Sequence, residues 1–520
     1  MILDLRNTET PDQLVCDVCI VGAGTVGSYL AHRLAARGVR VVVIEAGGRE
    51  CVSGSDAGFD PVMEAARYAG AFEGRAFGIG GTSSRWGGVL IPYSHVDVSA
   101  QNDARGEAWT GIVRIVGRHT PQVRAALGIR EEVDYDSLPT KLFPGVVDAF
   151  RSSSISMFAS EMLPFETRNL GRLLLRGGAS APTVIVNATV TEWAISSGEP
   201  RVESIIASSD TMTKVRILAR EYAIAAGALE SARILLEIDA QTGSRALLGS
   251  SSLGRCLSDH LSTSIGLIDP HAADRAAEIF GPRFVGTSMK AFRMVDTRAS
   301  DVLGRHFAHF VFHIENAGFA LAKKVLFGVQ AKKIPSLGVG EVARGIGGLL
   351  ALGYNKTISK RLHVPGGTPV SLQLDIEQSP EEKNRLSLSD ERDRFGRRRA
   401  QIAWSVSEND LRRIAAMQTR FFANWERSSG VLPKLIRAEE SAVQAKLHDA
   451  YHPVGLCRIG DDAGAVVSFD LRVRGTVNLR LLSTGLFPTA GCANPTFSLL
   501  CLAEEFADSV SRTSAATSSR

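Results

Sequence analysis

The chain has 520 residues, 44% hydrophobic and 22% charged, which is typical of a globular protein with two or three domains. Its formal net charge is only +4, from 59 Lys and Arg against 55 Asp and Glu, so nothing indicates nucleic acid or a strongly polyanionic partner. The seven cysteines are scattered and odd in number, which favours a reducing compartment over a disulfide framework.

The first residues, MILDLRNTETPDQLVCDV, show neither a basic region followed by an apolar stretch nor a twin arginine, so we expect no secretory signal. No run of about 18 apolar residues predicts a transmembrane helix. We therefore expect a cytoplasmic protein. Cys16 and Cys19 form a C-x-x-C that runs into an apolar stretch, where thiols behave as small hydrophobic side chains, and we predict no metal site.

A dinucleotide-binding fingerprint follows at once. The stretch IVGAGTVGSYLAHRLAARGVRVVVIE reads as a strand, a glycine turn, a helix and a second strand. Gly22 suits the tight turn, Gly24 the close approach of a pyrophosphate, and Gly27 the close packing of helix on strand. Glu45 ends the second strand 18 residues after Gly27, where its carboxylate can accept both ribose hydroxyls and would repel a 2′-phosphate. The fingerprint does not distinguish FAD from NAD.

Three later stretches place small residues beside a predicted strand or helix: FGIGGTSSRWGGVLIPYS (77–94), REYAIAAGALESARILLE (220–237) and TVNLRLLSTGLFPTAGCANPTFSLL (476–500). One nicotinamide dinucleotide does not need four close backbone approaches spread over the whole chain. A longer cofactor with a tricyclic ring would use them.

Together, these four stretches resemble the glucose–methanol–choline (GMC) family of FAD-dependent oxidoreductases, and they occur in the family's order along the chain. The nearest-looking branch is the bacterial sugar-oxidising one, similar to pyranose oxidase. The resemblance implies an α/β fold in which a Rossmann-like FAD-binding domain is interleaved with a substrate domain built on a mixed or antiparallel sheet with helices. We expect the FAD-binding domain to comprise residues 1–95, 180–262 and 445–520, and the substrate domain residues 96–179 and 263–444.

The resemblance places the second glycine loop across the flavin and near its N5 edge, through Gly80, Gly81, Thr82 and Ser83. Gly227, Pro495 and Thr496 are expected to approach the same cofactor. Some sugar oxidases link the flavin covalently through a histidine directly before the tryptophan of this loop. Here Arg85 precedes Trp86, so we expect FAD to be bound non-covalently. Trp86 itself could equally be a flavin contact or a buried core aromatic.

The resemblance also covers the stretch YHPVGLCRIG (451–460) and the later Asn-Pro-Thr at 494–496. The family pairs the histidine of an H-x-x-G-x-x-R-x-G stretch with a histidine or asparagine before Pro-Thr, which His452 and Asn494 match. Leu456 and Ile459 depart from the usual Thr and Met, which affects loop packing but leaves the polar pair intact.

Alcohol oxidation by flavin removes a hydride from the carbinol carbon and a proton from the hydroxyl. A neutral imidazole, with an ordinary pKa near 6.5, can accept that proton. We therefore expect His452 to be the base, and Asn494, which cannot act as a base, to orient the substrate oxygen. The alternatives are that His452 is a satisfied core histidine and that Asn494 is the N-cap of the helix after it, with Pro495 at the first helical position; capping and orienting are compatible. For His260, in LGRCLSDHLS, a structural role is favoured.

The stretch VSLQLDIEQ (370–378) alternates in polarity, with Val370, Leu372, Leu374 and Ile376 on one face and Gln373, Asp375 and Glu377 on the other, as in a half-buried strand. It resembles the substrate-domain sheet that covers the flavin. Gln378 at its end could reach a substrate hydroxyl, although capping of the strand edge explains it better. Residues 319–363 interleave basic and apolar side chains; they could form a lid or a surface for a membrane or partner, but ordinary solvated helices are favoured.

The sequence thus predicts an enzyme that oxidises a CH–OH group, in a sugar or glycoside secondary alcohol, by hydride transfer to FAD with His452 as base. Its partners would be a small alcohol or sugar and an oxygen, quinone or protein electron acceptor. The alternatives are a biosynthetic alcohol oxidase acting on a larger natural product or sterol, a redox-neutral FAD-containing lyase, and an inactive flavin-binding protein.

Overall fold

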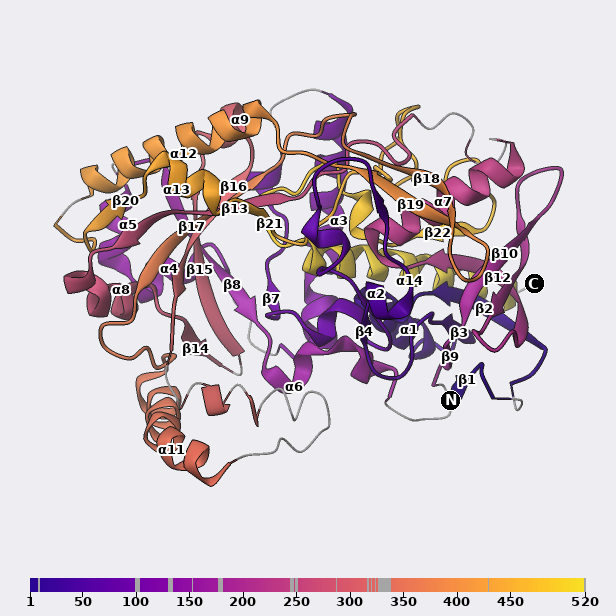
Figure 1. The fold of residues 1–520 in the computed structure, drawn as a ribbon, viewed down its shortest axis with the longest axis horizontal. Helices are drawn as coiled ribbons and strands as arrows, with labels where there is room; N and C mark the ends of the chain where they lie inside the picture. Colours follow the sequence, from indigo (N-terminus) through magenta and orange to yellow (C-terminus); the bar gives the residue numbers. More distant parts are fainter. Residues whose placement is uncertain are drawn as a thin grey trace.

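Two large β-sheets, each accompanied by helices, form the two halves of the molecule in the computed structural model (Figure 1). The structure describes the chain apart from residues 8–9, 99–102, 130–133, 152, 176–180, 244–246, 248–250, 287, 316–317, 319, 323, 326–337, 429 and 519–520.

The first sheet has eight strands in the order β1-β9-β3-β2-β12-β11-β10, with β22 also paired to β12. Strands β1, β9, β3, β2, β12 and β22 pair in parallel, whereas β10, β11 and β12 pair antiparallel. The strands are β1 (Ile2–Asp4), β2 (Gln13–Val21), β3 (Val41–Ile44), β9 (Thr183–Val186), β10 (Thr189–Ile195), β11 (Val202–Ser208), β12 (Lys214–Ile224) and β22 (Leu479–Leu481).

The predicted strand–helix–strand unit at the start of the chain is confirmed. Helix α1 (Thr25–Ala35) crosses from β2 to β3, and the two strands pair in parallel with Val18 opposite Val41. Strand β2 lies between β3 and β12, and its apolar run is buried, as expected for a parallel strand covered on both faces. Cys16 and Cys19 are buried in this strand as free thiols.

The second sheet has nine strands and only antiparallel pairings, in the order β20-β13-β17-β16-β15-β8-β7, with β14 on β15 and β21 on β13. The strands are β7 (Val89–Leu90), β8 (Ile155–Met162), β13 (His260–Ile268), β14 (Arg283–Val285), β15 (Ser288–Asp296), β16 (His306–Phe312), β17 (Val370–Glu377), β20 (Leu435–Arg437) and β21 (His448–Asp449).

The predicted alternation in β17 is present in the structure. Leu372 and Leu374 are fully buried, and Phe310, which pairs with Leu372, has its ring centroid 5.7 Å from that of Trp425. Because Trp425 belongs to α12 (Glu408–Arg427), α12 covers the apolar face of the second sheet (Figure 1). The polar side chains of β17 therefore lie on the opposite face.

The predicted domain ranges stay a prediction, and the two sheets can be compared with them. Strands β7 and β21 belong to the second sheet although they fall in the ranges given to the FAD-binding domain. Helix α3 (Ala104–Leu127) packs on α14 (Thr496–Ser518) of the first half, where His119 Nε2 lies 2.6 Å from a Glu505 carboxylate oxygen. The sequence shows no linker at these crossings, so each boundary was placed at a motif.

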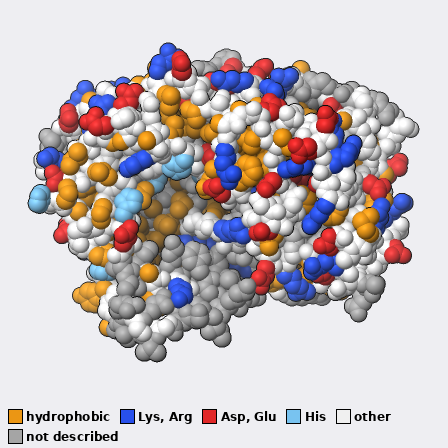
Figure 2. Space-filling view, viewed as in Figure 1, with side chains coloured by type: hydrophobic (Ala, Val, Ile, Leu, Met, Phe, Trp, Pro, Cys, Tyr) orange, Lys and Arg blue, Asp and Glu red, His pale blue; other side chains and the backbone are white. Residues whose placement is uncertain are grey.

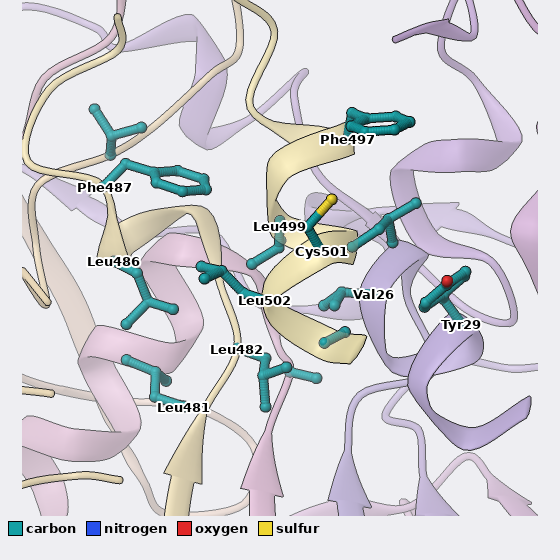
Figure 3. Packing of buried hydrophobic residues seen from close by; sticks show 14 of the residues in the cluster. Val26, Tyr29, Leu481, Leu482, Leu486, Phe487, Phe497, Leu499, Cys501 and Leu502 are labelled. Atoms are coloured by element: carbon teal, nitrogen blue, oxygen red, sulfur yellow. The ribbon is translucent and has the colours of Figure 1, made fainter. Parts of the chain in front are cut away.

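Helix α14 is held by close packing against α1 and the loop after β22. Figure 3 shows Leu499, Cys501 and Leu502 of α14 beside Val26 and Tyr29 of α1. The hydroxyl of Tyr29 donates to the buried carboxylate of Glu504 at 2.6 Å. This packing fixes the position of the first turn of α14 and of the loop before it.

The remaining described elements are shorter or peripheral. Within 319–363, the described part contains α11 (Val339–Tyr354), a π-helical turn (Asn355–Ser359) and the exposed side chains of Leu350 and Ile358; the prediction for residues 319, 323 and 326–337 lies outside the described residues. Among the described helices, none is long and apolar enough to cross a membrane. The other helices and strands are β4 (Val52–Ser53), α2 (Gly54–Ala57), β5 (Val62–Met63), β6 (Ala76–Phe77), α4 (Leu138–Leu142), α5 (Pro144–Phe150), α6 (Phe165–Arg168), α7 (Gly227–Thr242), α8 (Ala273–Phe280), α9 (Ser300–Leu303), β18 (Arg385–Arg392), β19 (Arg398–Ala403) and α13 (Glu440–Ala445).

Candidate active site

A cavity of about 230 Å³ is lined by most of the predicted site residues. The surface is also visibly hollowed between the two halves, with histidine side chains at the edge of the hollow (Figure 2). The predicted residues that line the cavity are Gly22, Gly24, Glu45, Gly81, Thr82, Gly227, His452, Pro495 and Thr496. Gly27, Gly80, Ser83, Gln378 and Asn494 are not among its lining residues.

The first glycine turn has the geometry that its spacing predicts. Gly22 has φ +110°, which side chains disfavour, and a Cβ on Gly27 would lie 1.9 Å from the carbonyl oxygen of Gly22. By contrast, a Cβ on Gly24 would meet no protein atom within 4 Å. Gly27 is thus required for helix packing, whereas the space beside Gly24 is left open toward the cavity.

Glu45 holds three separate segments of backbone together. One carboxylate oxygen accepts the N–H of Ala23 at 2.7 Å, and the other accepts those of Gly47 and Gly78 at 2.8 and 2.9 Å. Burial raises the pKa of Glu45, while these donors favour the ionised form. Glu45 therefore fixes the first turn against the second glycine loop, and its contact with a ribose stays a prediction.

The second glycine loop lies directly against the first turn. A Cβ on Gly81 would lie 2.8 Å from Gly24 Cα. The Ser83 hydroxyl accepts the N–H of Leu170 at 3.0 Å and donates to the carbonyl of Gly80 at 2.6 Å, so it shapes the loop from within. Trp86 is half-buried and packs against the hydrophobic core, and its indole N–H donates to the Arg168 carbonyl at 2.9 Å; its contact with a flavin stays a prediction.

The two predicted catalytic residues, His452 and Asn494, lie close together although they are 42 positions apart in the sequence. His452 Nε2 lies 3.4 Å from Asn494 Nδ2. The other ring nitrogen, His452 Nδ1, lies 3.0 Å from Nδ1 of His260. Helix α14 begins at Thr496 and the carbonyl of Pro495 accepts the N–H of Leu499, so Pro495 occupies the cap position that the sequence suggested for Asn494. The Asn494 side chain faces the histidine instead.

A buried carboxylate holds the backbone of both histidines. Asp259 accepts the N–H of His260 at 2.7 Å and the N–H of His452 at 2.9 Å, and it also accepts the hydroxyl of Tyr68. Burial, with the neighbouring Asp449 carboxylate, raises the pKa of Asp259 to about 8. This role of Asp259 could not be predicted, because an aspartate next to a histidine has no distinctive sequence pattern.

The environment of His452 keeps its imidazole neutral. Desolvation is the main cause, and the proximity of His260 adds to it; together they lower the pKa of His452 to about 3. Tyr451, directly before it, has φ +62°, an uncommon conformation for a non-glycine residue that often accompanies functional sites. The strained residue turns the chain so that His452 reaches the cavity.

Gln378 has a different environment from the one predicted for substrate binding. It is fully buried, its Nε2 donates to the carbonyl of Ser405 at 2.8 Å, and its Oε1 accepts the indole N–H of Trp404 at 2.9 Å. The amide is therefore engaged at both ends. This geometry matches the alternative, capping at the strand end, and leaves no free group for a substrate hydroxyl.

Several cavity residues were missed by sequence reasoning. Thr189 and Ser483 line the cavity, and their buried hydroxyls have no hydrogen-bond partner within the described structure. The guanidinium groups of Arg75 and Arg397 line it as well, each within 3.5 Å of a Glu230 carboxylate oxygen. Isolated threonines, serines and arginines carry no periodic signal, so only the fold brings them together.

These features fit an FAD. The open space beside Gly24 suits a diphosphate approaching the backbone, and cationic side chains in the wall suit its charge. The two unpartnered hydroxyls can hydrogen-bond polar groups of a ligand, which removes the penalty of burying them alone.

Comparison with known protein families identifies two segments of the chain, and each segment contains predicted site residues. The family model described as "GMC oxidoreductase" matches residues 380–503, and one described as "FAD binding domain" matches residues 15–70. The first range contains His452 and Asn494, and the second contains the first glycine turn and Glu45.

Curated relatives match short segments. The "Alcohol dehydrogenase [acceptor]" of Pseudomonas putida is 33% identical over 70 residues, which is 14% of this chain and 13% of that protein. The "Oxygen-dependent choline dehydrogenase" of Vibrio vulnificus is 38% identical over 68 residues, or 13% of this chain and 12% of the relative. The matched region is thus a small part of each relative's length.

Solved structures match the whole fold. Pyridoxine 4-oxidase, recorded as from Mesorbium loti, superposes with a TM-score of 0.56 at 18% identity, covering 95% of this chain and 99% of that one. Formate oxidase from Aspergillus oryzae gives a TM-score of 0.60 at 16% identity, covering 97% and 99%. The solved structures show that the same fold extends over nearly the whole chain, and the two family models identify, within it, the C-terminal domain of a GMC oxidoreductase and a domain that binds FAD as the cofactor.

Proposed function

We propose that this protein oxidises a CH–OH group of a small molecule, with His452 as the base and Asn494 as the group that orients the substrate oxygen. The observation that carries the proposal is the half-buried His452–Asn494 pair, of which His452 lines the FAD cavity. A bound FAD supplies the acceptor for the hydride of the carbinol carbon. The residues of the chain bind and orient the alcohol and accept its proton.

His452 suits this task because it is neutral and faces the cavity. Its lowered pKa keeps the imidazole unprotonated near neutral pH. Asn494 cannot take a proton, but an amide 3.4 Å from the imidazole can share the same substrate oxygen and fix its direction. Nothing in this pair requires a metal ion, and the described residues contain no cluster of metal-ligating side chains.

A polyhydroxylated substrate, such as a sugar or glycoside, is the finer part of the proposal. Ser262 lies two residues after His260 in β13 and therefore on the same face of the second sheet. Its hydroxyl donates to Asp375 at 2.6 Å and accepts from the amide of Gln373 at 2.9 Å. The imidazole of His309 lies 3.2 Å from the other oxygen of Asp375. This row of hydrogen-bonding groups suits several hydroxyls better than an apolar chain.

The test is anaerobic reduction of the bound flavin, followed by its visible absorption. The purified holoprotein is mixed with D-glucose, methyl β-D-glucoside, glycerol, benzyl alcohol or choline. Bleaching by the first two, and not by benzyl alcohol, supports a sugar substrate. Bleaching by benzyl alcohol alone contradicts the sugar assignment but keeps alcohol oxidation, and no bleaching by any alcohol contradicts the proposal as it stands.

The variant His452→Ala separates the base from the cofactor site. We expect it to retain FAD, because the glycine turn, Glu45 and α14 are untouched, and to reduce the flavin at least about 100-fold more slowly, the usual contribution of a positioned base. His448→Ala is the matched control, since its imidazole is exposed in β21 only four residues away. Equal rates in the two variants would show that His452 is not the base.

A further inference from the structure

The imidazole of His452 touches that of a second histidine from the other half of the molecule. His260 opens β13 of the second sheet, and its ring meets that of His452 nearly perpendicularly, at 82° with centroids 5.2 Å apart. The ring of His260 is buried and that of His452 is half-buried, and their Nδ1 atoms are 3.0 Å apart. At this distance one Nδ1 must donate a proton and the other must accept it.

The surroundings of His260 decide which nitrogen donates. His260 Nε2 lies 2.9 Å from the carbonyl oxygen of Gly491, and a carbonyl can only accept. Nε2 therefore carries a hydrogen. Burial lowers the pKa of His260, so its imidazole is neutral and has no second hydrogen on Nδ1. In the opposite tautomer, two lone pairs would face each other at 2.9 Å.

The tautomer of His260 determines the tautomer of His452. If His260 Nδ1 is an acceptor, His452 Nδ1 must carry the hydrogen, and the neutral ring of His452 then has a bare Nε2. Asn494 agrees with this direction, because its Nδ2, a donor, is the amide atom that faces His452 Nε2. The chain of donors runs from Asn494 through His452 and His260 to Gly491, so it starts and ends in the same loop.

We propose that His260 is a positioning residue that holds His452 in the tautomer whose Nε2 carries no hydrogen and can accept the substrate proton. The inference rests on the proposed function. In the reaction, the hydroxyl proton moves to His452 Nε2 while the carbinol hydride leaves to the FAD, the oxidant. The resulting imidazolium keeps its Nδ1–H bond to His260, so no other hydrogen has to move.

A purely structural role for the His260 ring explains less. The backbone N–H groups of His260 and His452 are both held by Asp259, and β13 pairs with β17 along its whole length. The ring itself adds only the contacts with His452 Nδ1 and the Gly491 carbonyl, together with an edge contact to Phe307. The other titratable groups acting on these rings are the carboxylates of Asp97, Asp375 and Glu377.

Two variants of His260 test the acceptor. In His260→Asn, the side-chain Oδ1 branches from Cγ as Nδ1 does, so it can still accept from His452. In His260→Leu, a side chain of similar reach offers no acceptor. With the panel alcohol that reduces the wild type fastest, we expect His260→Leu to reduce the flavin at least about 100-fold more slowly and His260→Asn to recover most of that loss.

The tautomer is read directly by two-dimensional ¹H–¹⁵N NMR of the holoprotein labelled with ¹⁵N-histidine, with the His452 signals assigned by their absence in His452→Ala. We expect hydrogen on Nδ1 of His452 in the wild type and in His260→Asn, and on Nε2 in His260→Leu. Hydrogen on Nε2 in the wild type, or an unchanged tautomer in His260→Leu, would overturn the inference. This readout needs no substrate, so it decides the role of His260 even if no alcohol reduces the flavin and the proposed function fails.

Discussion

At the scale of single residues, desolvation keeps the imidazole of His452 neutral, so it can accept a proton, but also makes it a weaker base. With a pKa lowered to about 3, the imidazole is neutral under all ordinary conditions, yet it is too weak a base to remove a proton from a resting alcohol. A hydroxyl becomes far more acidic as hydride leaves the adjacent carbon. Proton transfer to His452 is therefore expected to accompany hydride departure and not to precede it.

This has a consequence for pH dependence. The neutral base is lost only when pH falls through its pKa, which lies near 3 here and not near the ordinary 6.5. The rate of flavin reduction measured by anaerobic stopped flow should therefore show no loss from protonation of His452 down to about pH 5, and a change near pH 8 would report Asp259, whose pKa is raised to about 8. A tenfold fall per pH unit beginning near 6.5 would show that His452 titrates as an exposed histidine.

At the scale of elements, the two glycine loops form one structure. Gly81 lies against Gly24, and Glu45 accepts hydrogen bonds from the backbone of both loops. The two loops, which are far apart in the sequence, together form one surface of backbone atoms without side chains. Each glycine in it has its own neighbour, so substitutions of the same size should have different effects.

Gly24→Ala and Gly27→Ala form a matched pair, since each adds one methyl group. The Cβ at Gly24 meets no protein atom, whereas that at Gly27 would lie 1.9 Å from the Gly22 carbonyl oxygen. We expect Gly24→Ala to unfold at the wild-type temperature without cofactor but to bind FAD at least about tenfold more weakly, or about 1.4 kcal/mol. Gly27→Ala should lower the unfolding temperature of the apoprotein itself.

Calorimetry of the apoproteins and FAD titration check this pair. If Gly24→Ala binds FAD as tightly as the wild type, the space beside Gly24 is not the diphosphate site. If Gly27→Ala unfolds at the wild-type temperature, the turn relaxes more easily than its geometry indicates.

The structure could be predicted from the sequence where a single element carries its own residue pattern. The G-x-G-x-x-G spacing located the first turn, and the alternation in 370–377 gave both faces of β17, because periodicity reflects local geometry. It failed where a residue's role depends on a distant neighbour. The Gln378 amide is engaged by Trp404 and Ser405 across a strand end, and the cap position at α14 moved to Pro495 because the Asn494 side chain faces His452.

Contacts across the two halves were the least predictable. His260 and Asp259 lie almost 200 positions from His452, and no local pattern in the sequence joins them. Thr189 and Ser483 gave no signal at all, although both line the cavity with unpartnered hydroxyls. Such roles come from topology, which places β10 and the end of β22 at the same cavity.

At the scale of the whole molecule, a buried ion pair at the edge of the second sheet is hydrogen-bonded to the loop that carries the site. Arg305, before β16, lies 3.3 Å from a carboxylate oxygen of Glu377 and donates to the Asp97 carbonyl at 2.6 Å. Glu377 also accepts the hydroxyl of Thr489 at 2.5 Å, in the loop that leads to Asn494. The ion pair thus links the second sheet to the loop that carries the site.

Arg305→Ala should destabilise the protein strongly, because it leaves the buried carboxylate of Glu377 without its main counter-charge; removal of one member of a buried pair costs about 3–5 kcal/mol. Arg40→Ala is the control, since its bond with Asp17 lies at the surface and should leave the unfolding temperature nearly unchanged. Differential scanning fluorimetry of both holoproteins makes the comparison. Equal unfolding temperatures would show that the ion pair does not stabilise the fold.

The packing of α14 on α1 also sets an order of events during biosynthesis. Strand β2 and α1 leave the ribosome early, yet the wall of the cofactor cavity remains incomplete until Pro495, Thr496 and Leu499 have been made. Strand β22, which completes the pairing of β12, is likewise a late product. A nascent chain therefore carries an unfinished nucleotide-binding half through most of its translation. The cavity wall is thus complete only after Leu499 has been synthesised, so we expect cofactor loading to follow synthesis of the start of α14.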